Sequence, residues 1–300
     1  MLAETPAGVI YDRGYRNYEG PRLGRPQIIR ALCWQSFRSS FGIGRGPKAK
    51  IVPIIAFVAL CLPSVVNAVA VARGGPAVVD YGTDILALRI VILTIFVAVQ
   101  APELVSRDIR SRVLPLYFSR PIHRLDYPLA KLVAFTLACT AMLDVPLLLL
   151  YLGNIVSAGG GSSVWLQTRE LAGGLAVGLL WAVLVAAISL ALASLSGRRA
   201  YATGIVAIFF FLTFTLAQLV YSIGQQGHAP TGGSIPGPRL AGLISPYFVI
   251  DGIRQWLGGR ASGVIAAPGG YGPVYGVMFL LLLAVSMATL AARYRKAALA

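Results

Sequence analysis

Residues 103–126 read ELVSRDIRSRVLPLYFSRPIHRLD, and this basic stretch decides the fold because it separates two long apolar blocks of the sequence. Its arginines are interspersed with apolar residues, a pattern typical of a segment that lies at a membrane surface. The arginines are Arg107, Arg110, Arg112, Arg120 and Arg124. A basic, amphipathic segment held between two apolar blocks of membrane length predicts an integral membrane protein.

The composition of the 300-residue chain supports the same prediction. Hydrophobic residues make up 57% of the chain and charged residues 12%, whereas soluble chains carry about 25% charged residues. The mean hydropathy is +0.74. The net charge of +15 would suggest a nucleic-acid ligand in a soluble chain, but here Lys and Arg cluster beside apolar segments. The charge therefore indicates membrane topology.

Six segments are apolar over about the 20 residues that a helix needs to cross the hydrocarbon of a membrane. They are residues 51–72, 85–105, 127–152, 170–195, 202–224 and 273–292. They predict an all-α transmembrane domain over residues 51–300, preceded by a cytosolic segment over residues 1–50. We expect the tract between the fifth and sixth spans to turn helical at Ser245 and to lie outside, as an external or re-entrant helix.

The basic residues predict the orientation of these spans. About twenty of the 26 Lys and Arg residues lie before the first span, after the second, after the fourth or after the sixth. Cytosolic loops carry such an excess of positive charge. We therefore expect a multi-pass protein of a bacterial plasma membrane, with both termini in the cytosol.

The N-terminal segment contains one predicted amphipathic helix, over residues 26–41. Pro26 suits a first helical turn, and an apolar stripe recurs at helical spacing. Arg30, Trp34 and Arg38 follow one another at intervals of four on a neighbouring face. A helix with a basic and aromatic flank beside an apolar stripe is expected to lie in the headgroup layer.

Few charged residues fall within the spans, and burial in hydrocarbon makes each a functional hypothesis. Arg89 and Asp144 lie at similar predicted depths and carry opposite charges. One interpretation is that they face each other or a shared polar cavity. The other is that Arg89 extends to lipid headgroups while Asp144 caps a kink before Pro146.

The fourth span carries small residues at intervals of four, which allow two helix backbones to approach closely in lipid. They are Gly174, Gly178, Ala182 and Ala186. The stripe predicts helix packing, either within this chain or between two copies of it.

The central basic stretch predicts a short amphipathic helix over residues 103–113, after a kink at Pro102. Glu103 could pair with Arg107 one turn later, pair with another element, or remain solvated. Around Pro115, which limits this helix, arginines flank a cluster of apolar side chains. This cluster consists of Leu114, Leu116, Tyr117 and Phe118. The combination suits docking into a groove of a soluble protein, and the alternative is that these side chains enter the headgroup layer.

The sequence contains none of the motifs that would indicate an enzyme in the membrane. HExxH, GxSxG and GxxxxGK[ST] are all absent. The two histidines, His123 and His228, are predicted on opposite sides of the membrane, and the three cysteines have no metal-binding spacing. We therefore expect no catalytic residue and no metal site, and any ATP hydrolysis requires another subunit.

Nearly the whole chain resembles the membrane subunits of ATP-binding cassette exporters of the ABC type 2 permease class, also called type V. The resemblance rests on the interfacial helix, the six spans, the loop RDIRSRVLPLYFSRPIHRLDYPLAK and the stretch SPYFVIDGIRQWLGG before the sixth span. It implies a permease that pairs with a second copy or a related permease and binds two copies of a separate ATPase. ATP and magnesium would belong to the ATPase, and this chain would hold no cofactor.

The resemblance also assigns roles to residues. The coupling helix, which contacts the ATPase, corresponds to about residues 106–121, and the interfacial helix makes a second contact through Arg30, Trp34 and Arg38. The implied coupling-helix residues are Arg107, Asp108, Arg110, Arg112, Leu114, Leu116, Tyr117, Phe118 and Arg120. The implied function is export of an amphipathic or hydrophobic substrate.

Two other functions compete with that of an export permease. The chain could be a membrane anchor or assembly subunit that recruits a soluble partner without transport. A lipid-modifying enzyme of the membrane is disfavoured because paired acid and base groups are missing from the sequence.

Overall fold

The computed structural model describes residues 24–75, 86–110, 125–156, 161–226, 237–258 and 268–297, together with Gly20 and His123. All regular structure in these residues is helical. In chain order the elements are α1 (Arg25–Ser40), α2 (Lys48–Ala72), α3 (Leu86–Arg110), α5 (Asp126–Val156), α6 (Gly161–Ser194), α7 (Arg199–Gln226), α8 (Gly237–Leu240), η1 (Ala241–Ile244), α9 (Pro246–Trp256), η2 (Gly269–Tyr271) and α10 (Gly272–Ala297).

Six of these helices are long and apolar enough to cross a membrane, namely α2, α3, α5, α6, α7 and α10. They correspond one to one with the six predicted spans. The largest difference in bounds is in α6, which begins at Gly161 rather than near residue 170. Its first turns contain polar residues, but Thr168 bonds both the Tyr151 hydroxyl (2.8 Å) and the Val164 carbonyl (2.9 Å). These bonds let the helix begin earlier than hydropathy indicates.

Helix α3 continues past Pro102, where the sequence predicts the start of a separate helix. Pro102 removes one backbone hydrogen bond from a helix interior, yet the helix runs through it to Arg110. The neighbours of Pro102 are fully packed, because Ala101 and Leu104 are buried. The second span and the first part of the predicted amphipathic helix are therefore one helix, which extends past the apolar segment. The predicted end of that amphipathic helix, at residue 113, lies outside the described residues.

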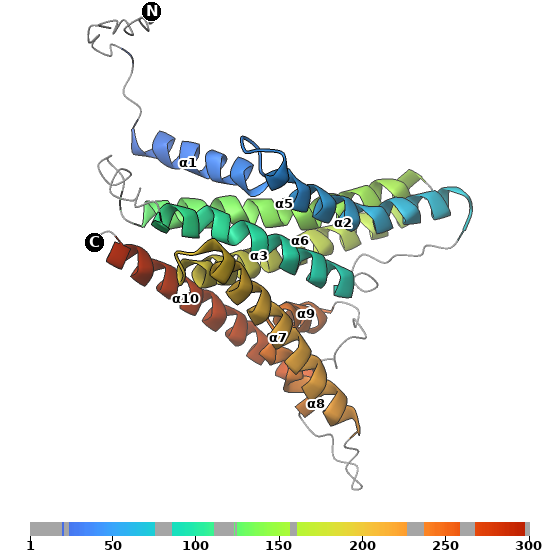
Figure 1. The fold of residues 1–300 in the computed structure, drawn as a ribbon. Helices are drawn as coiled ribbons and strands as arrows, with labels where there is room; N and C mark the ends of the chain where they lie inside the picture. The colour runs from blue at the N-terminus through green and yellow to red at the C-terminus, as the bar shows by residue number, and fades with distance from the viewer. Residues whose placement is uncertain are drawn as a thin grey trace, which may run out of the picture.

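Helices α3, α5 and α6 form the centre of the bundle. In the most apolar stretch of each of these helices, the buried share is 72% in α3, 56% in α5 and 61% in α6. The corresponding share is 22% in α2 and 17% in each of α7 and α10. Figure 1 shows α1 and α2 on one side of this centre and α7 and α10 on the other. The outer helices consequently present apolar side chains to lipid or to another protein.

Helix α9 fills the space between α6, α7 and α10. Ser245 is at its N-cap position and Pro246 at its first turn, as predicted. Its residues Tyr247, Phe248, Val249 and Ile250 are fully buried, and Tyr247 packs against Trp181 and Phe210. The segment is therefore packed into the bundle, and its predicted place, external or re-entrant, stays a prediction.

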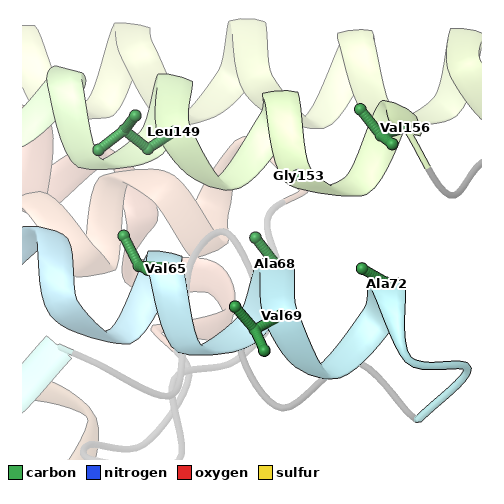
Figure 2. Close-up of a pocket in the computed structure, with 7 residues that line it drawn as sticks. All are labelled: Val65, Ala68, Val69, Ala72, Leu149, Gly153 and Val156. Atoms are coloured by element: carbon green, nitrogen blue, oxygen red, sulfur yellow. The ribbon is translucent and has the colours of Figure 1, made fainter.

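Helices α2 and α5 approach closely where α5 carries Gly153. A Cβ atom on Gly153 would overlap the side chain of Ala68, so glycine is needed for this contact. Beside it, Asn67 donates a hydrogen bond to Asn154 (3.0 Å). An apolar pocket of about 340 Å³ lies at this contact and is lined by residues of α2 and α5. Figure 2 shows these lining residues.

Candidate partner interface at the basic end of the bundle

Several elements meet at one end of the bundle, which we call the basic end: the end of α3, the beginning of α5, the turn from α6 to α7, and the end of α10 (Figure 1). Arg293 of α10 donates hydrogen bonds to the carbonyls of Ser194 (3.0 Å) and Leu195 (3.1 Å) at the end of α6. Cations near the last carbonyls of a helix are favourable. These bonds fix the end of α10 against the α6–α7 turn.

Glu103 joins three elements at the basic end. Its carboxylate, only 8% exposed, forms ion pairs with Arg45 (2.7 Å) from the α1–α2 loop and with Arg199 from the start of α7. Arg45 also contacts Gln100 one turn away on α3 (3.5 Å) and the Ser39 carbonyl. Of the three possibilities for Glu103, the structure therefore confirms that it pairs with other elements. The side chain of Arg107 lies outside the described residues.

Asp108 and Ser106 connect the end of α3 to two further helices. Asp108 accepts hydrogen bonds from Lys131 (2.8 Å) and from the Tyr127 hydroxyl, both on α5. The Ser106 hydroxyl donates to the Ala193 carbonyl of α6 (2.9 Å). Asp108, predicted to contact a partner, is therefore engaged within the chain by its carboxylate. Sequence reasoning missed these contacts because every partner is distant in the sequence.

Asp126 joins α1 to α5. Arg25 donates two hydrogen bonds to its carboxylate, each 2.7 Å long, and the His123 backbone N–H donates a third (2.8 Å). Such bidentate pairs fix orientation as well as distance. The first turn of α1 is thereby attached to the first turn of α5.

The acidic side chains of Glu103, Asp108 and Asp126 are thus all paired inside the chain, whereas several basic side chains remain exposed. On α1, the structure places Arg30, Trp34 and Arg38 on one exposed face, with Trp34 60% exposed. Arg110 is exposed at the end of α3. The remaining predicted partner-binding residues, Arg112, Leu114, Leu116, Tyr117, Phe118 and Arg120, lie outside the described residues.

Within the bundle, Arg89 and Asp144 lie near enough to interact electrostatically. The described residues contain no direct ion pair between them, and the Asp144 Oδ1 atom is buried without a hydrogen-bond partner. The predicted pairing of these two residues stays a prediction.

Neutralising variants test this pairing. Arg89→Gln and Asp144→Asn should each lower the yield of folded protein several-fold, because each leaves one charge uncompensated in the membrane. The double variant should recover most of that yield. Yield is measured by fluorescence-detected size exclusion in detergent. Additive losses in the double variant would instead indicate that Arg89 and Asp144 act independently.

The small-residue stripe of α6 packs within the chain. A Cβ atom on Gly178 would overlap the Asp144 carboxylate, and one on Gly174 would lie 3.4 Å from Leu147 Cδ1. Ala182 and Ala186 are also fully buried. Of the two alternatives, Gly174 and Gly178 therefore serve packing of α6 against α5.

In the part of the chain that the structure describes, no cluster of His, Cys, Asp and Glu side chains is arranged to hold a metal ion. His123 is exposed at the basic end, and His228 lies outside the described residues. Cys33, Cys61 and Cys139 are free thiols.

No protein-family model matches the chain, and no curated protein matches it. Any functional conclusion must therefore rest on the geometry of the basic end and on the sequence motifs.

Proposed function

We propose that the chain is the membrane-spanning permease subunit of an ATP-binding cassette exporter of the ABC type 2 class. It moves an amphipathic or hydrophobic substrate outward, using ATP hydrolysed by a separate subunit. The six apolar helices support a role within a membrane. The stretch between α3 and α5, in which the sequence combines arginines with apolar residues, supports binding of a soluble partner.

One observation carries this proposal: α3 extends beyond its apolar segment and is connected to four other elements near its end. Glu103 contacts the α1–α2 loop and α7, Ser106 contacts α6, and Asp108 contacts α5. A displacement applied just beyond Arg110 is therefore passed to most of the bundle at once. Conformational coupling requires such contiguous packed and hydrogen-bonded connections.

The distribution of Lys and Arg supports a cytosolic location of the basic end. With the basic end in the cytosol, most Lys and Arg residues follow the positive-inside rule, and both termini are cytosolic in a plasma membrane. The sequence carries no nucleotide motif, so ATP and magnesium are bound by the partner. The assembly contains two ATPase copies, and a second copy of this chain or a related permease.

The proposal is tested by reconstituting the chain in lipid with its ATPase. Leu116→Ala and Phe118→Ala should each weaken the complex about tenfold or more, since buried apolar anchors dominate interfaces. Arg110→Ala should lower the association rate more than the lifetime of the complex, because an exposed rim charge mainly steers association.

Arg73→Ala is the matched control, because Arg73 is an exposed arginine at the far end of α2 from the basic end. It should leave both complex formation and ATP turnover unchanged. Wild-type binding and turnover in all three test variants would remove the coupling assignment. Normal binding without any transport would favour the anchor function.

A further inference from the structure

A groove of about 1210 Å³ lies between α1 and α5. It is larger than the cavities of about 300–1,000 Å³ that bind drug-sized molecules. Its α5 side is formed by Leu137, Thr140 and Ala141, which lie about three to four helical turns beyond Asp126. The groove therefore extends from the basic end into the apolar part of the bundle.

The lining of the groove is amphipathic along its length. Arg25, Gln27 and Arg30 line the part formed by the first turns of α1, whereas Trp34 and Phe37 line the part farther along that helix. Trp34 is 60% and Leu137 48% exposed. Leu137, Thr140 and Ala141 belong to an apolar helix long enough to span a membrane, so this part of the groove lies within a candidate membrane span.

The charge at the mouth of the groove is positive. Arg25 is neutralised by Asp126, whereas Arg30 is exposed and has no acidic partner among the described residues. A ligand that complements this site carries a negative head and an apolar body. In a membrane, an anionic phospholipid has this chemistry.

We propose that the groove between α1 and α5 binds one anionic phospholipid, with its phosphate at Arg30 and its acyl chains against Trp34, Phe37 and Leu137. This lipid site is inferred from the groove alone, without the proposed transport function, although Arg30 and Trp34 are also predicted to contact the ATPase. The lipid would hold α1 against α5 beside the Arg25–Asp126 pair, whose arginine also lines the groove, so the position of α1 would depend on lipid composition.

The test uses the purified full-length chain, delipidated in detergent and titrated with phosphatidylglycerol or with phosphatidylcholine of the same acyl chains. Native mass spectrometry counts the bound lipids. Arg30→Gln should weaken phosphatidylglycerol binding about fivefold and leave phosphatidylcholine binding unchanged, as expected for one basic residue. Arg38→Gln is the matched control, because Arg38 is exposed on the same helix face but does not line the groove. It should leave both lipids unaffected.

Cys33 supplies a second readout, because it lines the groove. Burial raises the pKa of the Cys33 thiol, so its reaction with a maleimide is followed at mildly alkaline pH. Phosphatidylglycerol should slow the labelling of Cys33 but not that of Cys61 on α2, and Ala141→Phe should abolish this protection by filling the groove.

Two results would overturn the proposal. One is equal binding of the two lipids with no difference between Arg30→Gln and Arg38→Gln. The other is a Cys33 that lipid never protects and that becomes reactive only after deletion of residues 1–19. The second result would assign the groove to the N-terminal segment of the chain itself.

Discussion

Replacing Glu103 with Gln should lower the free energy of unfolding by about 3 kcal/mol, the effect of removing one partner from a buried ion pair. Glu103 forms ion pairs with both Arg45 and Arg199, and only 8% of its side chain is exposed. The neutral variant leaves both guanidinium groups without their carboxylate. The change is measured as a shift of the unfolding midpoint in a denaturing detergent titration.

The two arginines provide an internal comparison for this result. The Arg45 side chain is 17% exposed and that of Arg199 is 60% exposed, and exposed ion pairs contribute about 0–1 kcal/mol. Arg45→Gln should therefore destabilise the chain clearly more than Arg199→Gln. In a double-mutant cycle, Glu103→Gln should couple more strongly to Arg45→Gln. An unchanged midpoint in Glu103→Gln would show that these pairs do not hold the basic end together.

Gly178→Leu should produce the other large effect, a loss of correctly folded chain. A Cβ atom at position 178 overlaps the Asp144 carboxylate, which must shift to admit it, and the remaining leucine atoms must then fit at a buried position between α5 and α6. Overpacking of this kind costs about 1–3 kcal/mol before the added leucine atoms are placed. Thermal stability and yield of the purified chain measure the result.

Neighbouring glycines of the same helix make a graded control. Gly173 has open space where a Cβ would lie, and Gly174 has Leu147 Cδ1 at 3.4 Å. We expect Gly173→Ala to behave like the wild type, Gly174→Ala to lose little, and Gly178→Ala to lose most. A stable Gly178→Leu chain that fails only to form dimers would instead place the stripe between two copies of the chain.

The six membrane helices could be predicted from the sequence because hydropathy over about 20 residues reports the helix length that a bilayer requires. The bounds were less accurate where polar residues continue a helix. Gln167, Thr168 and Arg169 lie just before the predicted start of the fourth span, but they belong to α6 because α5 supplies hydrogen-bond partners such as Tyr151. A hydropathy pattern contains no information on partners from another helix.

The contacts of the basic end were beyond sequence reasoning for the same reason. The basic character of residues 103–126 indicated an interface, and Glu103 was recognised as a residue that could pair. Its actual partners, Arg45 and Arg199, come from the α1–α2 loop and from α7. Likewise, the burial of α9 depends on how α6, α7 and α10 diverge, which no local pattern describes.

The most direct test of the exporter assignment is a crosslinking measurement at position 118 in living cells. A photoreactive amino acid in place of Phe118 should crosslink the chain to a soluble protein that carries the GxxxxGK[ST] nucleotide motif. The same amino acid in place of Arg73 should not. Crosslinking only to lipid from position 118, or to the nucleotide-binding protein only from position 73, would contradict the account.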